Sequence, residues 1–349
     1  MKQLLAISVA VSLSLAGAGS KKAEGNNVAP EHECDRLASH PLSKNKVGDG
    51  VKRERLEPVE AIRACKYANS QFPKELRFMF QLGRSYEKHQ DYKSAVKWYT
   101  AAAKQGYAPA QSNLGTMYEI GEGVLPNDNI SINWTKLSAE QGYPVAQNNM
   151  GAKYLNGRGV VKNYDTAMRW IMLAADQEYD GAQMLLGVVY GQGLGRPRNL
   201  KTSLKWIELA AKQGNPDAQN LLGASFFEGV GTKQNYETAF KWFKLAAEQG
   251  KADAQHRVAV MLNNGQGVTK NYQIAVTWYK RAAQQGFAKA QIGLGSMHER
   301  GHGVEQDYEA ASRWYNLAAK NPDAPAGLQE LVDSRRAFLA YQQGNYTVA

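Results

Sequence analysis

The sequence predicts an all-α fold, an α/α solenoid of about seven stacked helix pairs. Two recurring patterns carry this prediction. All seven tryptophans stand 36 residues apart, and an Ala-Gln pair recurs with the same period. A period of roughly 20 to 50 residues is typical of proteins in which each repeat stacks on the next. The tryptophans are Trp98, Trp134, Trp170, Trp206, Trp242, Trp278 and Trp314.

One repeat, Ala218–Gly250, shows how each unit is built. Its first half, "AQNLLGASFFEG", predicts a helix that ends at glycine, which we call helix A. The following "GVGTKQN" predicts a turn. Helix B then begins after Asn235, a residue type that caps helix N-termini, and ends at Gly250. The capping position holds Asn or Asp in every unit, at Asp91, Asn127, Asn163, Asn199, Asn235, Asn271 and Asp307.

The middle of helix A holds a glycine in six units and Ala259 in the remaining one. A glycine inside a helix costs about 1 kcal/mol relative to alanine. Its recurrence therefore predicts a steric requirement for a small residue. We expect helix B of the same pair to approach this position closely. The six glycines are Gly83, Gly115, Gly151, Gly187, Gly223 and Gly295.

Residues 1–18 have the features of a signal peptide. Lys2 supplies a positive start, Leu4 to Leu15 form an apolar stretch, and "AGA" provides a cleavage site. We expect cleavage after Ala18 and a mature protein that is periplasmic or secreted. No later segment approaches about 18 uninterrupted apolar residues, so no stable membrane insertion is expected.

Residues 19–75 are predicted to form an N-terminal helical cap. Two helix-like stretches, "APEHECDRLASH" and "LEPVEAIRACKYAN", contain both cysteines of the chain, Cys34 and Cys65. In an oxidising compartment such a pair is expected to form one disulfide, with two unpaired buried thiols as the alternative. At the other end, residues 328–349 predict a capping helix and a polar tail. A solenoid needs such caps because its terminal units expose apolar surface.

The recurring pattern "LG..Y..G.GV..N...A..W...AA.QG...AQ" resembles the Sel1-like repeat, a relative of the tetratricopeptide repeat. Residues 76–327 carry it. The resemblance implies a right-handed superhelical solenoid. In the first unit, residues 76–110, the interval from Gly83 to Trp98 is too short for the G-x-G turn. This unit resembles a plain tetratricopeptide repeat, and residues 111–327 hold six Sel1-like repeats.

The string "HERGH" at residues 298–302 matches H-E-x-x-H, which in zinc proteases places two histidines on one helical face. A zinc-dependent hydrolase is therefore an alternative function. The repeat register argues against it, because His298 occupies a packing position near the end of helix A. Gly301 and Gly303 bracket His302 in the turn, so the helix is expected to break between the histidines. We predict a protein that is not an enzyme, with no cofactor and no metal site.

Similar Sel1-like proteins act as adaptors in envelope assembly, signalling regulation, exopolysaccharide production and host contact. The resemblance therefore implies a non-catalytic exported scaffold whose partners are envelope or secreted proteins. The formal net charge of +10 leaves an acidic envelope polysaccharide as an alternative partner. Nucleic acid is not expected, because the sequence holds no recognisable nucleic-acid module.

In tetratricopeptide-like arrays, helix A lines the concave face at positions three before and one, four and five after the small residue. Transferred by register, these positions are rich in amides, which can hydrogen-bond an extended peptide or glycan. Phe227 is the large aromatic of the set and a candidate anchor. The predicted binding residues are Arg84, Glu87, Lys88, Ser112, Thr116, Glu119, Asn148, Asn156, Met184, Gln192, Asn220, Phe227, Glu228, His256, Asn263, Asn264, Ile292, Glu299 and Arg300.

Overall fold

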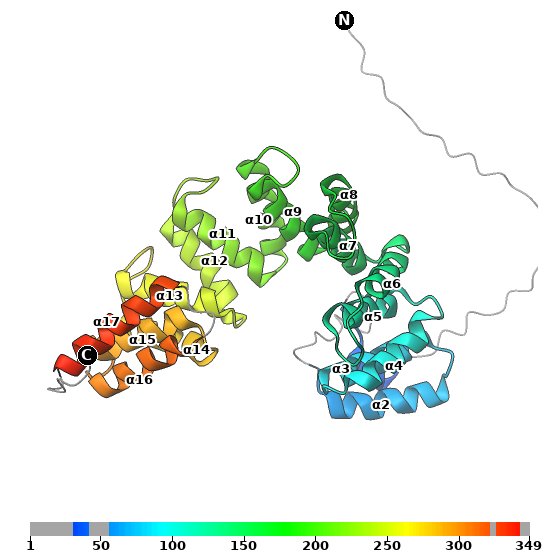
Figure 1. Ribbon diagram of the computed structural model, residues 1–349, viewed down its shortest axis with the longest axis horizontal. Coiled ribbons are helices and arrows are strands. Elements are labelled where there is room, and N and C mark those ends of the chain that lie inside the picture. Colours follow the sequence, from blue (N-terminus) through cyan, green and yellow to red (C-terminus); the bar gives the residue numbers. More distant parts are fainter. Residues whose placement is uncertain (1–30, 42–55, 322–325, 343–349) are drawn as a thin grey trace, which may run out of the picture.

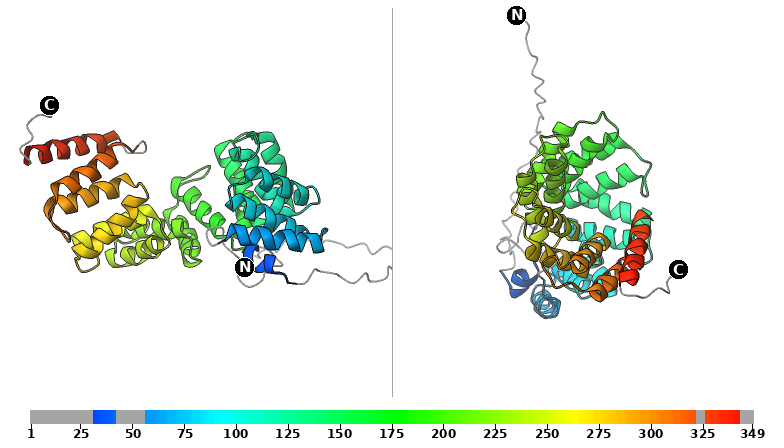
Figure 2. Two further views of the ribbon diagram at one scale, coloured as in Figure 1. Left: turned by 90° about the horizontal axis from the view of Figure 1, so that it is seen from below. Right: turned by 90° about the vertical axis from the view of Figure 1, so that its left-hand side faces the viewer.

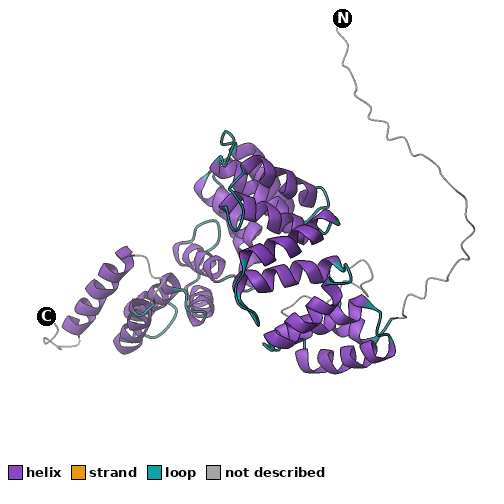
Figure 3. Ribbon diagram, turned by 45° about the vertical axis from the view of Figure 1, so that its right-hand side comes forward, coloured by secondary structure: helices purple, strands orange, loops and turns teal. Residues whose placement is uncertain are grey.

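The computed structural model describes residues 31–41, 56–321 and 326–342. Within these residues all regular structure is helical (Figure 3), and the predicted all-α fold is confirmed. The predicted signal peptide, residues 1–18, lies outside the described residues, as do residues 42–55 between the two helix-like stretches of the cap. Among the described helices, none combines the length and the apolar character needed to cross a membrane.

Two helices precede the repeats, seven helix pairs follow, and one helix closes the described chain. In chain order the helices are α1 (Glu33–Ala38), α2 (Pro58–Gln71), α3 (Leu76–Lys88), α4 (Tyr92–Ala103), α5 (Ala108–Ile120), α6 (Asp128–Glu140), α7 (Pro144–Asn156), α8 (Tyr164–Ala175), α9 (Asp180–Gln192), α10 (Leu200–Lys212), α11 (Pro216–Glu228), α12 (Tyr236–Glu248), α13 (Ala252–Asn264), α14 (Tyr272–Gln284), α15 (Ala288–Arg300), α16 (Tyr308–Ala319) and α17 (Ala326–Gln342).

The helix pairs stack side by side into a long curved array (Figure 1). Seen along its length, the array winds around a central axis (Figure 2). The odd-numbered helices from α3 to α15 are helices A, and their even-numbered partners are helices B. Neighbouring helices A contact each other directly, as α5 does with α7 and α13 with α15. Curvature brings the elements of the inner side closest together, so helices A form the concave side.

The capping residue predicted for helix B is confirmed in all seven units. In α12, for example, the side-chain oxygen of Asn235 accepts a hydrogen bond of 2.9 Å from the backbone N–H of Thr238. Helix A ends at a glycine with left-handed backbone in six units, as at Gly229 with φ 73°. The first unit differs: a short connection joins α3 to α4, and Gln90 adopts φ 64°.

The small residue of helix A meets helix B of the same pair, as the sequence predicts. A Cβ atom on Gly151 would lie 2.3 Å from Cγ1 of Ile171, and one on Gly187 would lie 2.4 Å from Cγ1 of Ile207. In each of the six units with glycine, the residue that follows the repeat tryptophan presses on it. The packing leaves no room for a larger side chain.

The recurring glutamine of the Ala-Gln pair ties three helices together. Gln219 in α11 donates to the carbonyl of Ala211 in the preceding helix B, at 3.2 Å. Its side-chain oxygen accepts from Gln249, which ends the helix B of its own pair, at 2.8 Å. Gln111, Gln147 and Gln255 make the same two bonds. The period of the Ala-Gln pair in the sequence therefore corresponds to a set of hydrogen bonds that recurs between neighbouring units.

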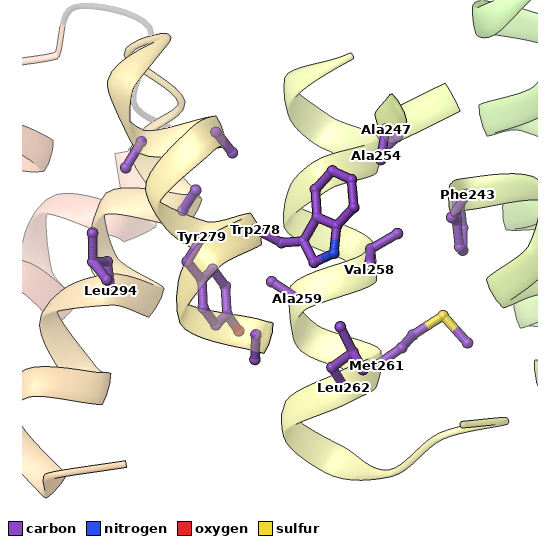
Figure 4. Close-up of a cluster of buried hydrophobic side chains, with 14 of the residues drawn as sticks. Phe243, Ala247, Ala254, Val258, Ala259, Met261, Leu262, Trp278, Tyr279 and Leu294 are labelled. Carbon is purple, nitrogen blue, oxygen red and sulfur yellow. The ribbon is translucent and has the colours of Figure 1, made fainter. Parts of the chain in front are cut away.

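The apolar core consists of a series of clusters along the array, which pack helices of the same and of neighbouring units together. Figure 4 shows the part between α12 and α15, where one cluster includes Phe243, Val258, Trp278, Tyr279 and Leu294. Trp278 lies against α13 and is 9% exposed. Each unit thus buries its apolar face on the next one, as a solenoid requires.

The N-terminal cap consists of α1 and α2 packed on α3. Cys34 in α1 and Cys65 in α2 form the predicted disulfide. Asp35 in α1 is 1% exposed and accepts a hydrogen bond of 3.1 Å from Nε of Arg77 in α3. Gln81 donates to the same carboxylate at 2.9 Å. The cap is thus joined to the first repeat by buried polar contacts as well as by apolar packing.

The C-terminal helix α17 packs against α16, in agreement with the predicted capping helix. Arg335 in α17 pairs with Glu299 in α15 at 3.1 Å, and Glu299 also accepts a hydrogen bond of 2.7 Å from Tyr315 in α16. In the second unit, Glu119 is likewise paired with Lys153 of the next helix A. Helix α17 therefore occupies the place of one further helix A.

Candidate binding surface

Four helices A carry a polar residue at the position three before the small residue. We call this set the inner polar row, and it consists of Ser112, Asn148, Asn220 and His256. An acceptor atom of each is buried without a hydrogen-bond partner within the described chain: Ser112 Oγ, Asn148 Oδ1, Asn220 Oδ1 and His256 Nδ1. The amide of Asn220 does donate, to Asp253 of the next helix A at 2.7 Å. In the other two Sel1-type units the position holds Met184 and Ile292.

A cavity of about 410 Å³ opens where α11, α12, α13 and the start of α15 meet. We call it the aromatic pocket. Two of the predicted residues, Phe227 and His256, lie in its wall. The ring of Phe227 is 6.3 Å from that of Phe243, and His256 is 5.5 Å from Phe287. The pocket is lined by Phe227, Phe243, Asp253, His256, Arg257, Val260, Met261, Phe287 and Lys289.

His256 is neutral at physiological pH. Burial, together with the positive charges of Lys289 and Arg257, lowers the pKa of its imidazole to about 4. A neutral imidazole keeps one ring nitrogen as a hydrogen-bond acceptor. The unpartnered Nδ1 of His256 can therefore accept a hydrogen bond from a bound molecule.

A second cavity, of about 250 Å³, lies between α5 and α7, and we call it the charged pocket. The predicted residues Thr116, Glu119 and Asn156 line it. Glu119 forms ion pairs with Lys153, which is 3% exposed, and with Arg158 at 2.8 Å. Arg158 also pairs with Asp128 at 3.3 Å, so two carboxylates neutralise the two cations within the chain.

The other predicted residues are more scattered. Arg84 is buried and donates to the carbonyl of Ala38 in the N-terminal cap at 2.7 Å. Glu299 is 7% exposed and bound to Tyr315 and Arg335. These two side chains are thus engaged by the fold itself, and we do not include them in the proposed surface. Glu87 is engaged by Tyr99, Asn263 and Lys88 are half-buried, and Gln192, Glu228, Asn264 and Arg300 are exposed.

Sequence reasoning missed seven of the nine residues that line the aromatic pocket, among them the charged residues Asp253, Arg257 and Lys289 and the aromatic Phe287. They fall at other positions of the repeat than those transferred from tetratricopeptide arrays. The 36-residue period contains a usable signal, because Phe287 shares its position with Tyr107, Tyr143 and Tyr179. An aromatic residue at the entry of successive helices A marks the boundary between units, where the pocket lies.

The predicted break within "HERGH" is confirmed. Helix α15 ends at Arg300, and Gly301 adopts φ 66°. His302 lies in the turn, where its ring stacks on Tyr272 at 4.4 Å. In the described part of the chain, no group of three His, Cys, Asp or Glu side chains converges as a possible metal site.

A family model described as Sel1 repeat matches seven segments, which correspond to the seven helix pairs: residues 78–107, 108–143, 144–179, 181–215, 216–251, 252–287 and 288–323. The chain belongs to the Sel1 repeat family. The first matched segment, residues 78–107, covers the unit with the short connection between α3 and α4, whose sequence resembles a tetratricopeptide repeat. No curated protein is similar enough in sequence to count as a relative.

Solved Sel1 structures share this architecture. One is a protective antigen present in uropathogenic Escherichia coli strains, with an SLR fold; it is 32% identical, covers 82% of this chain and has a TM-score of 0.61. This chain spans 61% of that antigen's chain. A Sel1 repeat protein from Oxalobacter formigenes is 29% identical over 71% of this chain and 99% of its own, with a TM-score of 0.59. Yeast Tom70, at 13% identity, 92% and 66% coverage and a TM-score of 0.53, shares the fold alone.

Proposed function

We propose that this Sel1 repeat protein is a non-catalytic exported adaptor, which holds an extended segment of a partner protein along its concave side. The inner polar row carries the proposal. Its acceptor atoms are buried and lack donors within the described chain. A buried polar atom without a partner costs about 1–3 kcal/mol. A ligand that brings N–H groups to these side chains, once they turn towards the groove, removes that cost, so the row favours binding.

An extended polypeptide suits the spacing of this row. Helices in contact lie roughly 8–10 Å apart, and an extended chain advances about 3.3 Å per residue. About three ligand residues therefore pass each unit, and backbone N–H groups can meet the acceptors of the four units that carry one. Recognition of backbone groups tolerates many ligand sequences, which agrees with a scaffold role.

Two features support export. Residues 1–18 have the composition of a signal peptide, and Cys34 is joined to Cys65. Disulfides persist mainly in oxidising compartments such as the periplasm. The proposed mature protein therefore begins after Ala18, as a periplasmic or secreted chain with a cap at residues 19–75 and a second cap at 328–349.

Site-specific photocrosslinking in intact cells tests which side binds. Thr116 is exposed and lines the charged pocket on helix A, whereas Lys205 is exposed on helix B in α10. A photoreactive residue at Thr116 is expected to capture a partner protein, and one at Lys205 is not. Capture from Lys205 alone contradicts the use of the concave side. Capture of no protein, with co-sedimentation on envelope polysaccharide at low salt, favours the polysaccharide alternative.

The inner polar row is tested with the captured partner. Asn148→Leu removes one acceptor and keeps a side chain of similar size, and we expect about tenfold weaker binding, the equivalent of one hydrogen bond. Asn133→Leu on helix B is the matched control, since Asn133 is exposed. Titration of both variants by calorimetry gives the comparison. Equal affinity of the two variants removes Asn148 from the binding site.

A further inference from the structure

The aromatic pocket combines an apolar floor with a volume suited to a side chain. Three phenylalanine rings from two neighbouring repeats line it together with Val260 and Met261: Phe227 and Phe243 from one repeat and Phe287 from the next. Its volume of about 410 Å³ falls within the range of ligand pockets, roughly 300–1,000 Å³. An aromatic side chain can stack edge-to-face against such rings at 4.5–7 Å between centroids, as a general preference.

The rim of this pocket carries two positive charges, Arg257 and Lys289. Within the described residues, neither belongs to an ion pair: Arg257 lies over the ring of Phe243 at 5.2 Å, and Lys289 is exposed. The one carboxylate of the pocket, Asp253, is hydrogen-bonded by Asn220 and by the backbone of Ala254. An excess of positive charge therefore faces the cavity.

The charged pocket on the same side provides a contrast. There the cations Lys153 and Arg158 are both paired with Glu119. Within the described residues, the cations of the aromatic pocket have no such partner. The aromatic pocket is thus complementary to an anion that comes from outside the chain.

Acceptors without partners lie before this pocket and in its wall. Asn220 in α11 precedes it, His256 lines it, and α15 continues the row of helices A after it. A bound segment can therefore continue past the pocket in both directions. This arrangement favours an internal stretch of a partner chain over a chain terminus.

We infer that the aromatic pocket is the specificity subsite of the concave side, and that it takes an aromatic side chain next to an acidic residue within an extended partner segment. The ring enters beside the half-buried Phe227 and Phe287, and the carboxylate pairs with Arg257 and Lys289. This inference rests on the proposed function, since it assumes that a peptide lies along helices A.

Fluorescence anisotropy with designed peptides tests the pocket. The probe is an N-acetylated, C-amidated, fluorescein-labelled Gly-Ser peptide with a central Phe-Glu pair. We expect saturable binding to the full chain, and about tenfold weaker binding when Phe is replaced by Ala or Glu by Gln. A peptide with a C-terminal Phe and a free carboxylate, binding more tightly than the internal pair, overturns the assignment to an internal segment.

Protein variants then locate the charge contact. Arg257→Gln and Lys289→Gln are each expected to abolish the preference for the Glu peptide over the Gln peptide, with unchanged circular dichroism. Lys280→Gln, at an exposed lysine on α14, is the control and should keep the preference. A preference that survives in both pocket variants overturns the proposal.

The partner captured through Thr116 separates this proposal from the proposed function. If the Phe-Glu peptide fails to bind while capture through Thr116 persists, the pocket assignment falls and the adaptor function stands. If capture through Thr116 also fails, the adaptor function falls with it.

Discussion

The two ends of the solenoid are closed in different ways. At the N-terminal end, a disulfide links α1 to α2, and Asp35 and Arg77, 1% and 4% exposed, form a buried ion pair. At the C-terminal end, the single helix α17 is attached through Arg335, which is 36% exposed, and Glu299. The first cap is a structure of its own, whereas the second continues the repeat geometry by one helix.

This difference predicts how strongly a substitution at each end lowers the stability of the array. In a repeat array, stability is nearly a sum of unit terms and nearest-neighbour terms. Within the described residues, helix α17 packs mainly on α16, so its loss removes one interface. The N-terminal cap is cross-linked internally by the disulfide, and ionic and apolar contacts couple it to the first repeat. We therefore expect the chain to open first at α17, and the following changes test that order.

Removal of the disulfide is expected to have the largest effect. The double variant Cys34→Ser, Cys65→Ser loses a link between residues 31 positions apart, which stabilises by roughly 3–4 kcal/mol on the chain-entropy model. Urea unfolding with and without reducing agent measures it. Reduced native protein should match the double variant, and the reductant should leave the variant itself unchanged. A midpoint shift in that variant on adding reductant points to a different cause.

Loss of the buried carboxylate of Asp35 comes next. Breaking a buried ion pair from one side costs about 3–5 kcal/mol. We expect about 3 kcal/mol for Asp35→Ala, because Glu75 remains within 3.3 Å of Arg77. Glu33→Ala on the same helix is the control, since Glu33 pairs with Arg36 at an exposed site and should cost less than about 1 kcal/mol. Similar unfolding midpoints for both variants contradict the role given to Asp35.

The repeat period predicted the parts of the fold that recur. Asn235 and its equivalents cap helix B, and Gly151 and its equivalents leave room for helix B, because each unit solves the same packing problem. The disulfide was predictable for a different reason, since the chain offers only Cys34 and Cys65. In these cases the structural feature follows from local geometry or from residue type, and both can be inferred from the sequence.

The role of a single groove residue was less predictable. Glu119 and Glu299 share a repeat position, yet their ion-pair partners differ. Glu119 pairs with Lys153 of the next helix A, and Glu299 pairs with Arg335 of the capping helix α17. The repeat register predicts the position of a side chain, but it does not predict which residue of the next unit contacts it. For the same reason, Arg257 was not predicted as a residue of the aromatic pocket.

The weaker C-terminal attachment is tested by Glu299→Ala. The carboxylate of Glu299 is 7% exposed, and its loss leaves Tyr315 and Arg335 without their acceptor. Hydrogen bonds to charged groups contribute about 1.5–3 kcal/mol, so we expect about 2 kcal/mol. Hydrogen exchange should show faster exchange in α17 and unchanged protection in α1 to α3. Glu309→Ala, at an exposed pair on α16, is the control and should alter neither region. Equal loss of protection at both ends contradicts the independence of the caps.

Acid provides the smallest and most selective change at the N-terminal end. His40 follows α1, and its ring lies tilted against that of Phe80, with 6.2 Å between the ring centroids. Burial, with a contribution from the Arg84 charge, lowers the pKa of its imidazole from 6.5 to about 3. Between these two values the unfolded chain binds more protons than the folded one, so stability falls as the pH drops through this window.

At pH 5.5, one unit below the ordinary pKa of histidine, His40 should therefore contribute about 1.4 kcal/mol less stability than at neutral pH. The difference in unfolding free energy between native protein and His40→Asn isolates this term, because the carboxylates titrate alike in both. We expect the difference to shrink as the pH is lowered from 7.5 to 5.5. A constant difference shows that His40 takes up its proton without opening the cap.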